Sequence, residues 1–266
     1  MVTPFLDTDI PPFLSMAKEE GWICHRWEFD FLLKNFAQGC LVKRDGKSAL
    51  GYITSVQFGR SGWIGNLLVQ QEFRRSGIGR ELMQGAISAL LKSGVETVWL
   101  TASEQGVELY RRLGFVPTDH ICRWSGEGAG KGLLQPGVPD FELVKAVDRE
   151  GWGERRDSLL VATCSRGSLF SSSAGFICCQ PWEDGTQIGP WGCLVASQAW
   201  PLLDQALSGV KGRVFLDVPA SNLAASALLG QSGFFVKGRS TLMHLGTEPR
   251  YHPGKVFALA SMGSMG

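Results

Sequence analysis

A basic, glycine-rich segment with the sequence FRRSGIGREL, residues 73–82, separates a run of apolar residues from a predicted helix. The first N–H groups of a helix lack an intrahelical partner, and the helix dipole is positive at that end. Gly77 and Gly79 would let an anion approach the backbone closely because they carry no Cβ. Three side chains add positive charge: Arg74, Arg75 and Arg80. The segment therefore predicts a binding site for a phosphate or a pyrophosphate.

Such glycine-rich stretches have other interpretations. A solvated basic loop that caps a helix is the plainest alternative. A dinucleotide-binding loop needs G-x-G-x-x-G, but Leu82 takes the third glycine position. Further on, GAGKG hints at a nucleotide P-loop, yet Gly126 stands one residue too close to the lysine and Gly132 replaces the required hydroxyl residue. The pattern that residues 74–79 do match is R-x-x-G-x-G.

The residues around this segment alternate between strand and helix patterns. Strands are predicted at 49–58 and 62–69, where apolar, β-branched and aromatic residues lie between glycine or polar positions. The helix after the segment is predicted from apolar residues at helical spacing: Leu82, Met83, Ala86, Ile87, Leu90 and Leu91. A strand at 95–103 and a short helix at 106–114 follow. This order is typical of an α/β protein.

Length, composition and charge limit the classes of protein. With 266 residues, 44% of them hydrophobic and 19% charged, the chain is expected to be globular with two domains. A formal net charge of +1 gives no general attraction to nucleic acid or anionic lipid, so neither is an expected partner. The N-terminal stretch lacks a basic start before an apolar run, and no stretch approaches the roughly 20 apolar residues of a spanning helix. A cytoplasmic protein is predicted.

The seven cysteines include no C-x-x-C pair. Neither a disulfide framework nor a zinc site is therefore predicted, and no metal ligand is assigned. Cys178 and Cys179 are interpreted as buried free thiols on a strand.

A glycine- and proline-rich stretch divides the chain. Residues 126–139, GEGAGKGLLQPGVP, lack apolar periodicity and are typical of a connector. The domains are thus predicted at 1–125 and 140–266. Within the second, residues 188–234 again predict strand, helix, strand and helix in that order.

Two motifs of the first half resemble those of the GNAT superfamily of acyl-CoA-dependent N-acetyltransferases. R-x-x-G-x-G stands between a strand and a leucine-rich helix, as in that family. The family's second motif is Asn-x-x-Ala-x-x-Leu-Tyr followed by Gly-Phe, and it corresponds here to Ser103, Gly106, Leu109, Tyr110, Gly114 and Phe115. Ser103 and Gly106 depart from the family's asparagine and alanine.

The resemblance implies a fold and a cofactor. The fold class is α/β (α+β), with two tandem GNAT folds, each a mixed, mostly antiparallel twisted sheet flanked by helices. The cofactor is acetyl-CoA, with its pyrophosphate on the loop amides and its pantetheine arm along a splayed strand. The residues implied to bind it are Leu67, Leu68, Val69, Arg74, Arg75, Ser76, Gly77, Ile78, Gly79, Arg80, Ser103 and Tyr110.

The second half carries the second motif at the same spacing but lacks the first. Leu229 replaces the tyrosine among the matching residues, which are Asn222, Ala225, Leu228, Gly233 and Phe234. The halves therefore look like tandem copies of one fold. They resemble a subgroup of tandem GNAT proteins whose second domain has GP and DVPxxN signatures, here Gly189-Pro190 and residues 217–222. The second domain is expected to bind CoA poorly or not at all.

The chemistry implied by the resemblance is direct attack of a neutral amine on the thioester. A backbone amide at Leu68 or Val69 would stabilise the oxyanion. Tyr110 would protonate the leaving thiolate, although a tyrosine beside Leu109 also fits a plain core position.

The acceptor side is assigned by position to Trp22, Trp27, Glu28 and Asn66. The two tryptophans fit core packing equally well. The general base is left open among a water chain and five side chains: Glu28, Asp30, Glu104, His25 and Asp217.

Two functions are compatible with these residues. The first is an N-acetyltransferase that acts on a primary amine of a small molecule or a peptide. The second is a non-catalytic acyl-CoA-binding regulatory module. Tyr110 and the intact first loop favour the enzyme, with a second domain that shapes the acceptor site or a homodimer.

Overall fold

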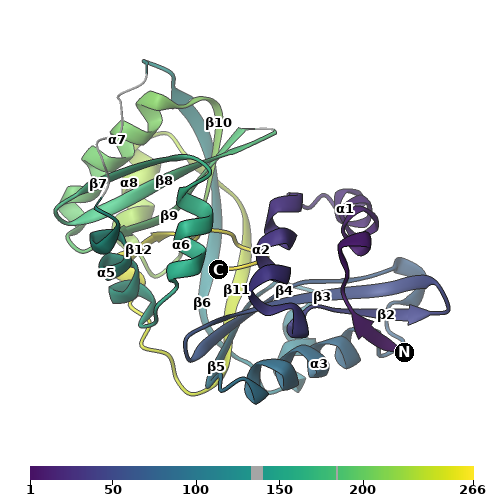
Figure 1. The fold of residues 1–266 in the computed structure, drawn as a ribbon. Coiled ribbons are helices and arrows are strands. Elements are labelled where there is room, and N and C mark those ends of the chain that lie inside the picture. Colours follow the sequence, from purple (N-terminus) through teal and green to yellow (C-terminus); the bar gives the residue numbers. More distant parts are fainter. Residues whose placement is uncertain (133–139, 184) are drawn as a thin grey trace. The chain divides into compact units, whose positions relative to one another are not determined.

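The computed structural model describes residues 1–132, 140–183 and 185–266 and shows two compact units (Figure 1). The first unit comprises Met1–Leu100, Leu245–Thr247 and Gly263–Met265. The second comprises Thr101–His244, Glu248–Met262 and Gly266.

The first unit is built on a sheet with the strand order β1-β2-β3-β4-β5. Neighbouring strands are antiparallel except β4 and β5, which are parallel. The strands are β1 (Val2–Pro4), β2 (Leu41–Asp45), β3 (Ser48–Phe58), β4 (Ser61–Val69) and β5 (Thr97–Ala102). Helices α1 (Ile10–Glu19) and α2 (Arg26–Phe36) cover one face of this sheet, and α3 (Ile78–Lys92) covers the other (Figure 1). Three single 3-10 turns are η1 (Asp7–Asp9), η2 (Ala37–Gly39) and η3 (Gln71–Phe73).

Aromatic packing fixes α1 and α2 on the sheet. The ring of Phe13 on α1 lies 4.7 Å from that of Phe29 on α2 and 5.5 Å from that of Tyr52 on β3. All three side chains are buried, and such ring pairs add to the stability gained from burial alone. Helices α1 and α2 are thus packed against β3. The region of these helices contains residues that the sequence assigns to the acceptor side.

The second unit has the strand order β11-β6-β10-β9-β8-β7, and β12 pairs with β9. β9 and β10 are parallel, and the other described neighbours are antiparallel. Its strands are β6 (Val116–Ala129), β7 (Ser168–Ser172), β8 (Gly175–Trp182), β9 (Gly185–Cys193), β10 (Lys211–Pro219), β11 (Phe235–Gly246) and β12 (Val256–Ala258). Its helices are α4 (Val107–Arg112), α5 (Phe141–Trp152), α6 (Asp157–Cys164), α7 (Ala199–Gly209) and α8 (Leu223–Gln231), with 3-10 turns η4 (Ala196–Gln198) and η5 (Pro253–Lys255).

Strand β8 is buried on both faces. Phe176 and Cys178 pack with the cluster formed by α5 and α6, whereas Ile177 and Cys179 pack with the cluster formed by α7. This alternation follows from the period of two in a strand. Cys178 and Cys179 are buried free thiols on a strand, so that prediction is confirmed.

The elements predicted from sequence are confirmed, and the two halves repeat one order. The predicted strands and helices of the first half are β3, β4, α3, β5 and α4. Those of the second half are β9, α7, β10 and α8. Leu91 differs from its predicted core position, since it lies at the edge of the buried stripe of α3 and is exposed.

The predicted connector begins inside a strand. Residues 126–129 end β6, which forms ladders with β10 and β11, and 133–139 lie outside the described residues. Because these ladders join β6 to β10 and β11, the contacts between residues divide the first half of the chain after Leu100. The domains at 1–125 and 140–266, predicted from the connector, stay a prediction.

Candidate functional site

Strand β4 separates from β5 just before the residues predicted to line the pantetheine arm. The parallel ladder ends at the pair Trp63 and Trp99. Within the described residues, 64–69 therefore continue without a ladder partner on the β5 side. Backbone N–H and C=O groups need partners when they are buried, and a ligand can supply them here.

A β-bulge interrupts β4 at Asn66, where β4 has one more residue than β3 between the flanking pairs. Asn66 has a φ of 55°, which asparagine tolerates better than most residues. Its side-chain N–H donates to Thr54 Oγ1 at 2.9 Å, and the Thr54 hydroxyl donates to the Gly65 carbonyl at 3.3 Å. These bonds hold the bulge. Asn66 is thus bound within the strand pair, and its contact with the acceptor stays a prediction.

The loop after β4 leaves the N-terminus of α3 open. Gly77 is the N-cap residue, with a φ of 92°, and no described side chain caps the helix there. A Cβ built on Gly77 would meet nothing within 4 Å. The first amides of α3 therefore point to open space at the positive end of the helix dipole. This geometry fits a pyrophosphate group.

The three arginines of the loop are not equivalent. Arg74 Nη2 lies 2.6 Å from Glu20 Oε1, and Arg74 Nε donates to the Val69 carbonyl at 3.1 Å. Arg75 and Arg80 are exposed and form no ion pair with any described residue. Two of the predicted cations are thus available to an anion, while the third ties the end of β4 to α1.

Glu20 is a residue of this region that the sequence did not single out. Hydrogen bonds from Gln71 and then from Arg74 hold the pKa of its carboxyl below the usual value. Glu20 therefore stays ionised and keeps Arg74 in place. A hollow of about 340 Å³ surrounds this pair and is lined by Met16, Glu19, Glu20, Val69, Gln70, Gln71, Glu72 and Arg74.

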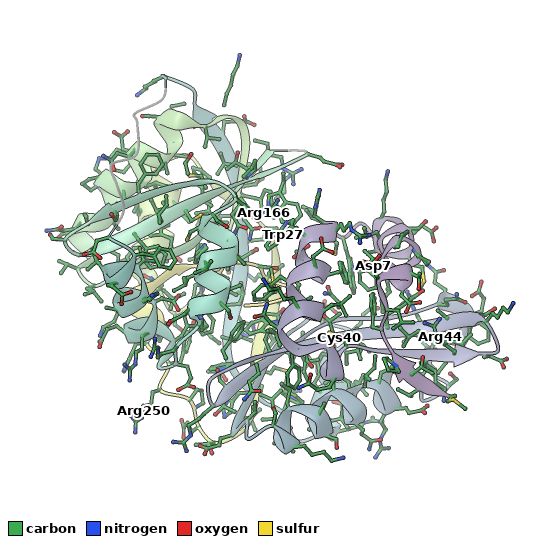
Figure 2. All side chains as sticks on the ribbon, in the orientation of Figure 1. Asp7, Trp27, Cys40, Arg44, Arg166 and Arg250 are labelled. Atoms are coloured by element: carbon green, nitrogen blue, oxygen red, sulfur yellow. The ribbon has the colours of Figure 1, made fainter. Side chains whose placement is uncertain are left out.

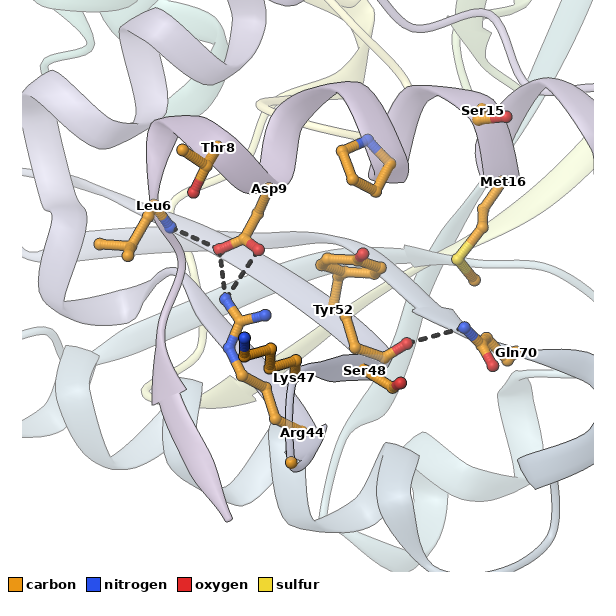
Figure 3. A pocket seen from close by; sticks show the side chains of 13 residues that line it. Leu6, Thr8, Asp9, Ser15, Met16, Arg44, Lys47, Ser48, Tyr52 and Gln70 are labelled. Atoms are coloured by element: carbon orange, nitrogen blue, oxygen red, sulfur yellow. Dashed lines mark hydrogen bonds and ion pairs between the residues drawn. The ribbon is translucent and has the colours of Figure 1, made fainter.

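A larger hollow, of about 820 Å³, lies beside α1 and the β2–β3 hairpin (Figure 3). The Asp9 carboxylate faces Arg44 in it, with Nη2 at 2.7 and 2.6 Å from the two oxygens. Asp9 Oδ2 also accepts the N–H of Leu6 at 2.8 Å. The charges of Asp9 and Arg44 in this hollow therefore satisfy each other, and they fix the start of α1.

Tyr110 and Ser103 belong to the second unit. The Ser103 carbonyl accepts the N–H groups of Gly106 and Val107 at 2.9 and 3.2 Å and so starts the turn into α4. The Tyr110 ring packs edge-on against Phe115 at 6.1 Å. Burial raises the pKa of Tyr110 to about 12, so its hydroxyl keeps its proton at neutral pH.

The glycine at the family's alanine position has a local explanation. A Cβ built on Gly106 would lie 3.0 Å from the Tyr110 ring, and the ring would have to shift to admit it. The joint role of Tyr110 with Leu68 or Val69, which belong to the first unit, stays a prediction.

On the acceptor side, Glu28 is the most constrained of the predicted residues. Its side chain is buried, with the whole residue 2% exposed. Oε2 accepts the N–H of His25 at 2.8 Å in a capping box at the start of α2, and Oε1 accepts the hydroxyl of Ser264. Trp22 is 40% exposed, with its ring 6.5 Å from that of Phe13, and Trp27 is partly buried on the first turn of α2.

The other candidates for the general base have different surroundings. Asp217 is fully buried and receives two hydrogen bonds from Arg123, at 2.8 and 2.7 Å. It therefore serves as half of a structural ion pair. Asp30 lies 3.6 Å from Arg26 Nε on the surface of α2, and Glu104 is exposed.

The buried thiols of Cys40 and Cys179 add no nucleophile to the candidate site. Burial raises the pKa of the Cys40 and Cys179 thiols to about 12, so neither is a thiolate at neutral pH. Cys40 follows η2, and its thiol donates to the carbonyl of Phe36, the last residue of α2 (Figure 2). Across the described residues, no three His, Cys, Asp or Glu side chains gather where they could hold a metal ion. In the same part of the chain, no helix has both the length and the apolar character needed to cross a bilayer.

The second unit has a gap between β9 and β10 that corresponds to the gap between β4 and β5 in the first unit. A segment of the chain itself, β12, fills this gap. The parallel ladder between β9 and β10 ends at Gln187 and Phe215. Beyond it β12 pairs antiparallel with β9, with Val256 opposite Gly192. Strand β12 therefore supplies backbone partners of the kind that a ligand would supply in the first unit.

Residues of the second-domain signatures hold this segment. The N–H of Leu259 donates to the Asp217 carbonyl at 2.8 Å, and the Asn222 side-chain N–H donates to the Val256 carbonyl at 2.9 Å. A Cβ built on Gly189 would lie 2.0 Å from the Leu259 carbonyl oxygen. Residues of the GP and DVPxxN signatures thus all contact the segment 256–259 and hold it in place.

Comparison with known families gives a match in each half of the chain. The Acetyltransferase (GNAT) family matches residues 5–115, and an Acetyltransferase (GNAT) domain matches residues 144–258. The chain belongs to the GNAT acetyltransferases. GNAT enzymes use acetyl-CoA as a co-substrate and transfer its acyl group to amines. This GNAT protein has two GNAT domains in tandem.

Several relatives resemble this GNAT protein. An uncharacterized N-acetyltransferase of Bacillus subtilis, YitH, is 23% identical over 225 residues, which is 77% of each chain. N-alpha-acetyltransferase 30 of Homo sapiens is 27% identical over 106 residues, which is 37% of this chain and 29% of that protein. The crystal structure of a candidate acetyltransferase from Pyrococcus horikoshii has a TM-score of 0.84 at 21% identity and covers 100% of this chain and 95% of its own. That likeness supports the fold.

Proposed function

We propose that the protein is an N-acetyltransferase that moves an acetyl group from acetyl-CoA to a primary amine by direct attack on the thioester. The observation that carries the proposal is the combination of an open strand and an open helix N-terminus in the first unit. Strand β4 loses its β5 partner after Trp63, and α3 begins at Gly77 with uncapped amides. One ligand with a peptide-like arm and a diphosphate would satisfy both.

The proposed cofactor contacts follow from this geometry. Amides of residues 76–80 bind the diphosphate, and Arg75 and Arg80 attract it with charges that no described acid neutralises. Backbone groups of residues 67–69 bind the pantetheine arm, as strand neighbours bind one another. Arg74 acts indirectly because Glu20 and the Val69 carbonyl hold it. Bound acetyl-CoA supplies the activated acyl group.

The proposed chemistry uses three further groups. An amide at Leu68 or Val69 stabilises the oxyanion. Tyr110, kept protonated by burial, gives a proton to the leaving sulfur. Glu28 takes a proton from the acceptor ammonium, which leaves a neutral amine able to attack. Among the general-base candidates, Glu28 is favoured because it is buried and each of its carboxylate oxygens accepts a hydrogen bond from a neutral donor.

The acceptor is proposed to be a small-molecule amine or the amino group of a peptide. One relative is named an N-alpha-acetyltransferase, so peptide α-amino groups belong among the first acceptors to try. We infer that the second domain takes no acetyl-CoA, since β12 already occupies its gap.

The direct test is to incubate the protein with acetyl-CoA and a panel of alkylamines, polyamines, amino acids and short peptides, and to measure release of free thiol. Acceptor-dependent thiol release is expected, together with binding of one acetyl-CoA per chain by calorimetry. Tight binding without thiol release from any acceptor would instead support a regulatory acyl-CoA-binding module. Binding of two equivalents would contradict a filled second gap.

A further inference from the structure

The final residues of the chain form a closed turn. The N–H of Gly266 donates to the Ser261 carbonyl at 3.1 Å. The Gly266 carbonyl accepts the N–H groups of Ala260 and Ser261 at 3.1 and 3.3 Å. The tip of this turn, Gly263–Met265, belongs to the first unit, and Ser264 and Met265 are buried. The turn is therefore fixed by hydrogen bonds and by the burial of its tip.

The tip of the turn packs directly on β4. A Cβ built on Gly65 would lie 2.3 Å from the Gly263 carbonyl oxygen and 2.8 Å from the Ser264 Cα. A side chain at position 65 would thus push the turn away. Gly65 precedes the bulge residue Asn66, so Ser264 lies beside the point where β4 leaves β5.

Ser264 also contacts α2. Its hydroxyl donates to Glu28 Oε1, while the His25 N–H donates to Oε2 at 2.8 Å. Because Ser264 touches both Gly65 and Glu28, it brings the carboxylate of α2 to the bulge of β4. Each carboxylate oxygen of Glu28 thus accepts a hydrogen bond that helps to fix its direction.

We propose that Ser264 is a positioning residue for acetyl transfer: its hydroxyl, with the His25 amide, orients the Glu28 carboxylate toward the acceptor amine at the β4 bulge. This inference rests on the proposed function and assigns part of the acceptor site to residues far from both GNAT motifs. The acceptor ammonium gives its proton to the oriented Glu28 carboxylate. The lone pair that is freed attacks the acyl carbonyl, and the C–S bond breaks. The leaving sulfur takes the Tyr110 proton, and the proton lost by the acetylated nitrogen restores it. Without the Ser264 hydroxyl, Glu28 Oε1 loses a donor that helps to fix the direction of the carboxylate.

The test is a double-mutant cycle measured by thiol release with the best acceptor of the panel. Ser264→Ala is expected to lower kcat/KM for the amine about tenfold, the effect of losing one hydrogen bond to a charged group. In a Glu28→Gln background the same change is expected to have less than about a twofold effect, because its target is gone. The dissociation constant of acetyl-CoA is expected to stay the same in each variant.

Two further variants separate positioning from general stability. Gly263→Ala changes the neighbouring residue where a Cβ meets nothing within 4 Å, and it is expected to leave kcat/KM unchanged. Gly65→Ala keeps Ser264 and Glu28 but displaces the turn, and it is expected to reproduce the loss seen for Ser264→Ala. Thermal unfolding of every variant shows whether it is folded.

The outcomes distinguish the two proposals. Equal losses from Ser264→Ala with Glu28 and with Gln at position 28 would show a merely structural role and overturn the inference. Faster transfer by Ser264→Ala would show that the turn blocks acceptors, which also overturns it. If the unmodified protein releases no thiol with any acceptor, the proposed function fails, and the role of Ser264 fails with it.

Discussion

The two units contain the same gap in a sheet and satisfy it in opposite ways. In the first unit β4 leaves β5 after Trp63, and in the second unit β9 leaves β10 after Gln187. The second gap receives β12, whereas in the first unit the turn at 263–265 reaches only the start of the free stretch, at Gly65. The loops differ in the same direction, because R-x-x-G-x-G is present after β4 and absent after β9.

In the proposed function, this difference explains how one copy of a duplicated fold does without the ligand and remains stable. Buried backbone N–H and C=O groups beside such a gap need hydrogen-bond partners, which either the chain or a ligand can supply. In the second unit a strand of the same chain does so permanently, and the conformational cost of ordering it is met by burying apolar side chains such as Phe257 and Ala258. In the first unit the groups stay available for acetyl-CoA in the proposed function.

The largest expected effect concerns the filled gap. Phe257 on β12 is fully buried, with its ring 4.9 Å from that of Trp191. Phe257→Ala is expected to lower the free energy of unfolding by about 3–5 kcal/mol, through lost burial and a cavity. Chemical denaturation measures it, and Phe235→Ala, at a residue 55% exposed, is the control with little change. A loss below about 1 kcal/mol would show that β12 is not an integral part of the second unit.

The next effect concerns the tyrosine that the second copy replaces by Leu229. Tyr110→Phe is expected to lower kcat about 100-fold, the usual scale for one proton-transfer group, without changing acetyl-CoA affinity. Tyr251→Phe, at a half-buried tyrosine with no assigned role in the reaction, is the control. Since burial raises the pKa of Tyr110 to about 12, its acid form persists as pH rises, and turnover should show no loss from its deprotonation until pH approaches that value. Unchanged kcat in Tyr110→Phe would remove its role as the acid.

A smaller effect is expected from the glycine of the first loop. Gly77→Val is expected to weaken acetyl-CoA binding about 30-fold, or on the order of 2 kcal/mol, because a β-branched residue is strained at a φ of 92° and displaces the amides. Gly233→Val is a matched control, since Gly233 has a φ of 81° and equally open space but lies in the second unit. Equal calorimetric dissociation constants for both variants would break the contrast between the units.

The smallest effect is electrostatic. Arg75→Ala and Arg80→Ala are each expected to weaken acetyl-CoA binding about threefold at low ionic strength, and less at high salt, because exposed charges are screened. Lys92→Ala, at the other end of α3, is the control and should leave binding unchanged. An effect that does not fall with added salt would mean that the arginines act through structure.

Local patterns predicted the parts of the site that depend on neighbouring residues. The stripe from Leu82 to Leu90 predicted α3, and Gly77 predicted an open helix N-terminus, because helix periodicity and a left-handed φ are short-range properties. The second motif predicted α4 and the position of Tyr110 on it.

Other features could not be predicted from local patterns. Arg74 stays a predicted cofactor residue, but its hydrogen bond to Glu20, 54 positions away in the sequence, could not be predicted. The division after Leu100 followed from the pairing of β6 with β10, which no local pattern of β6 expresses. Strand partners are chosen by long-range packing, so sequence periodicity alone does not reveal them.

The sequence by itself determined that two copies of one fold are present and that one of them carries the R-x-x-G-x-G loop, since glycines, arginines and apolar periodicity act over a few residues. The tertiary structure alone decided which gap is filled and what surrounds Glu28, whose partner Ser264 lies 236 positions away. Such contacts depend on where the folded backbone brings distant segments, and the covalent order of residues carries no local sign of it.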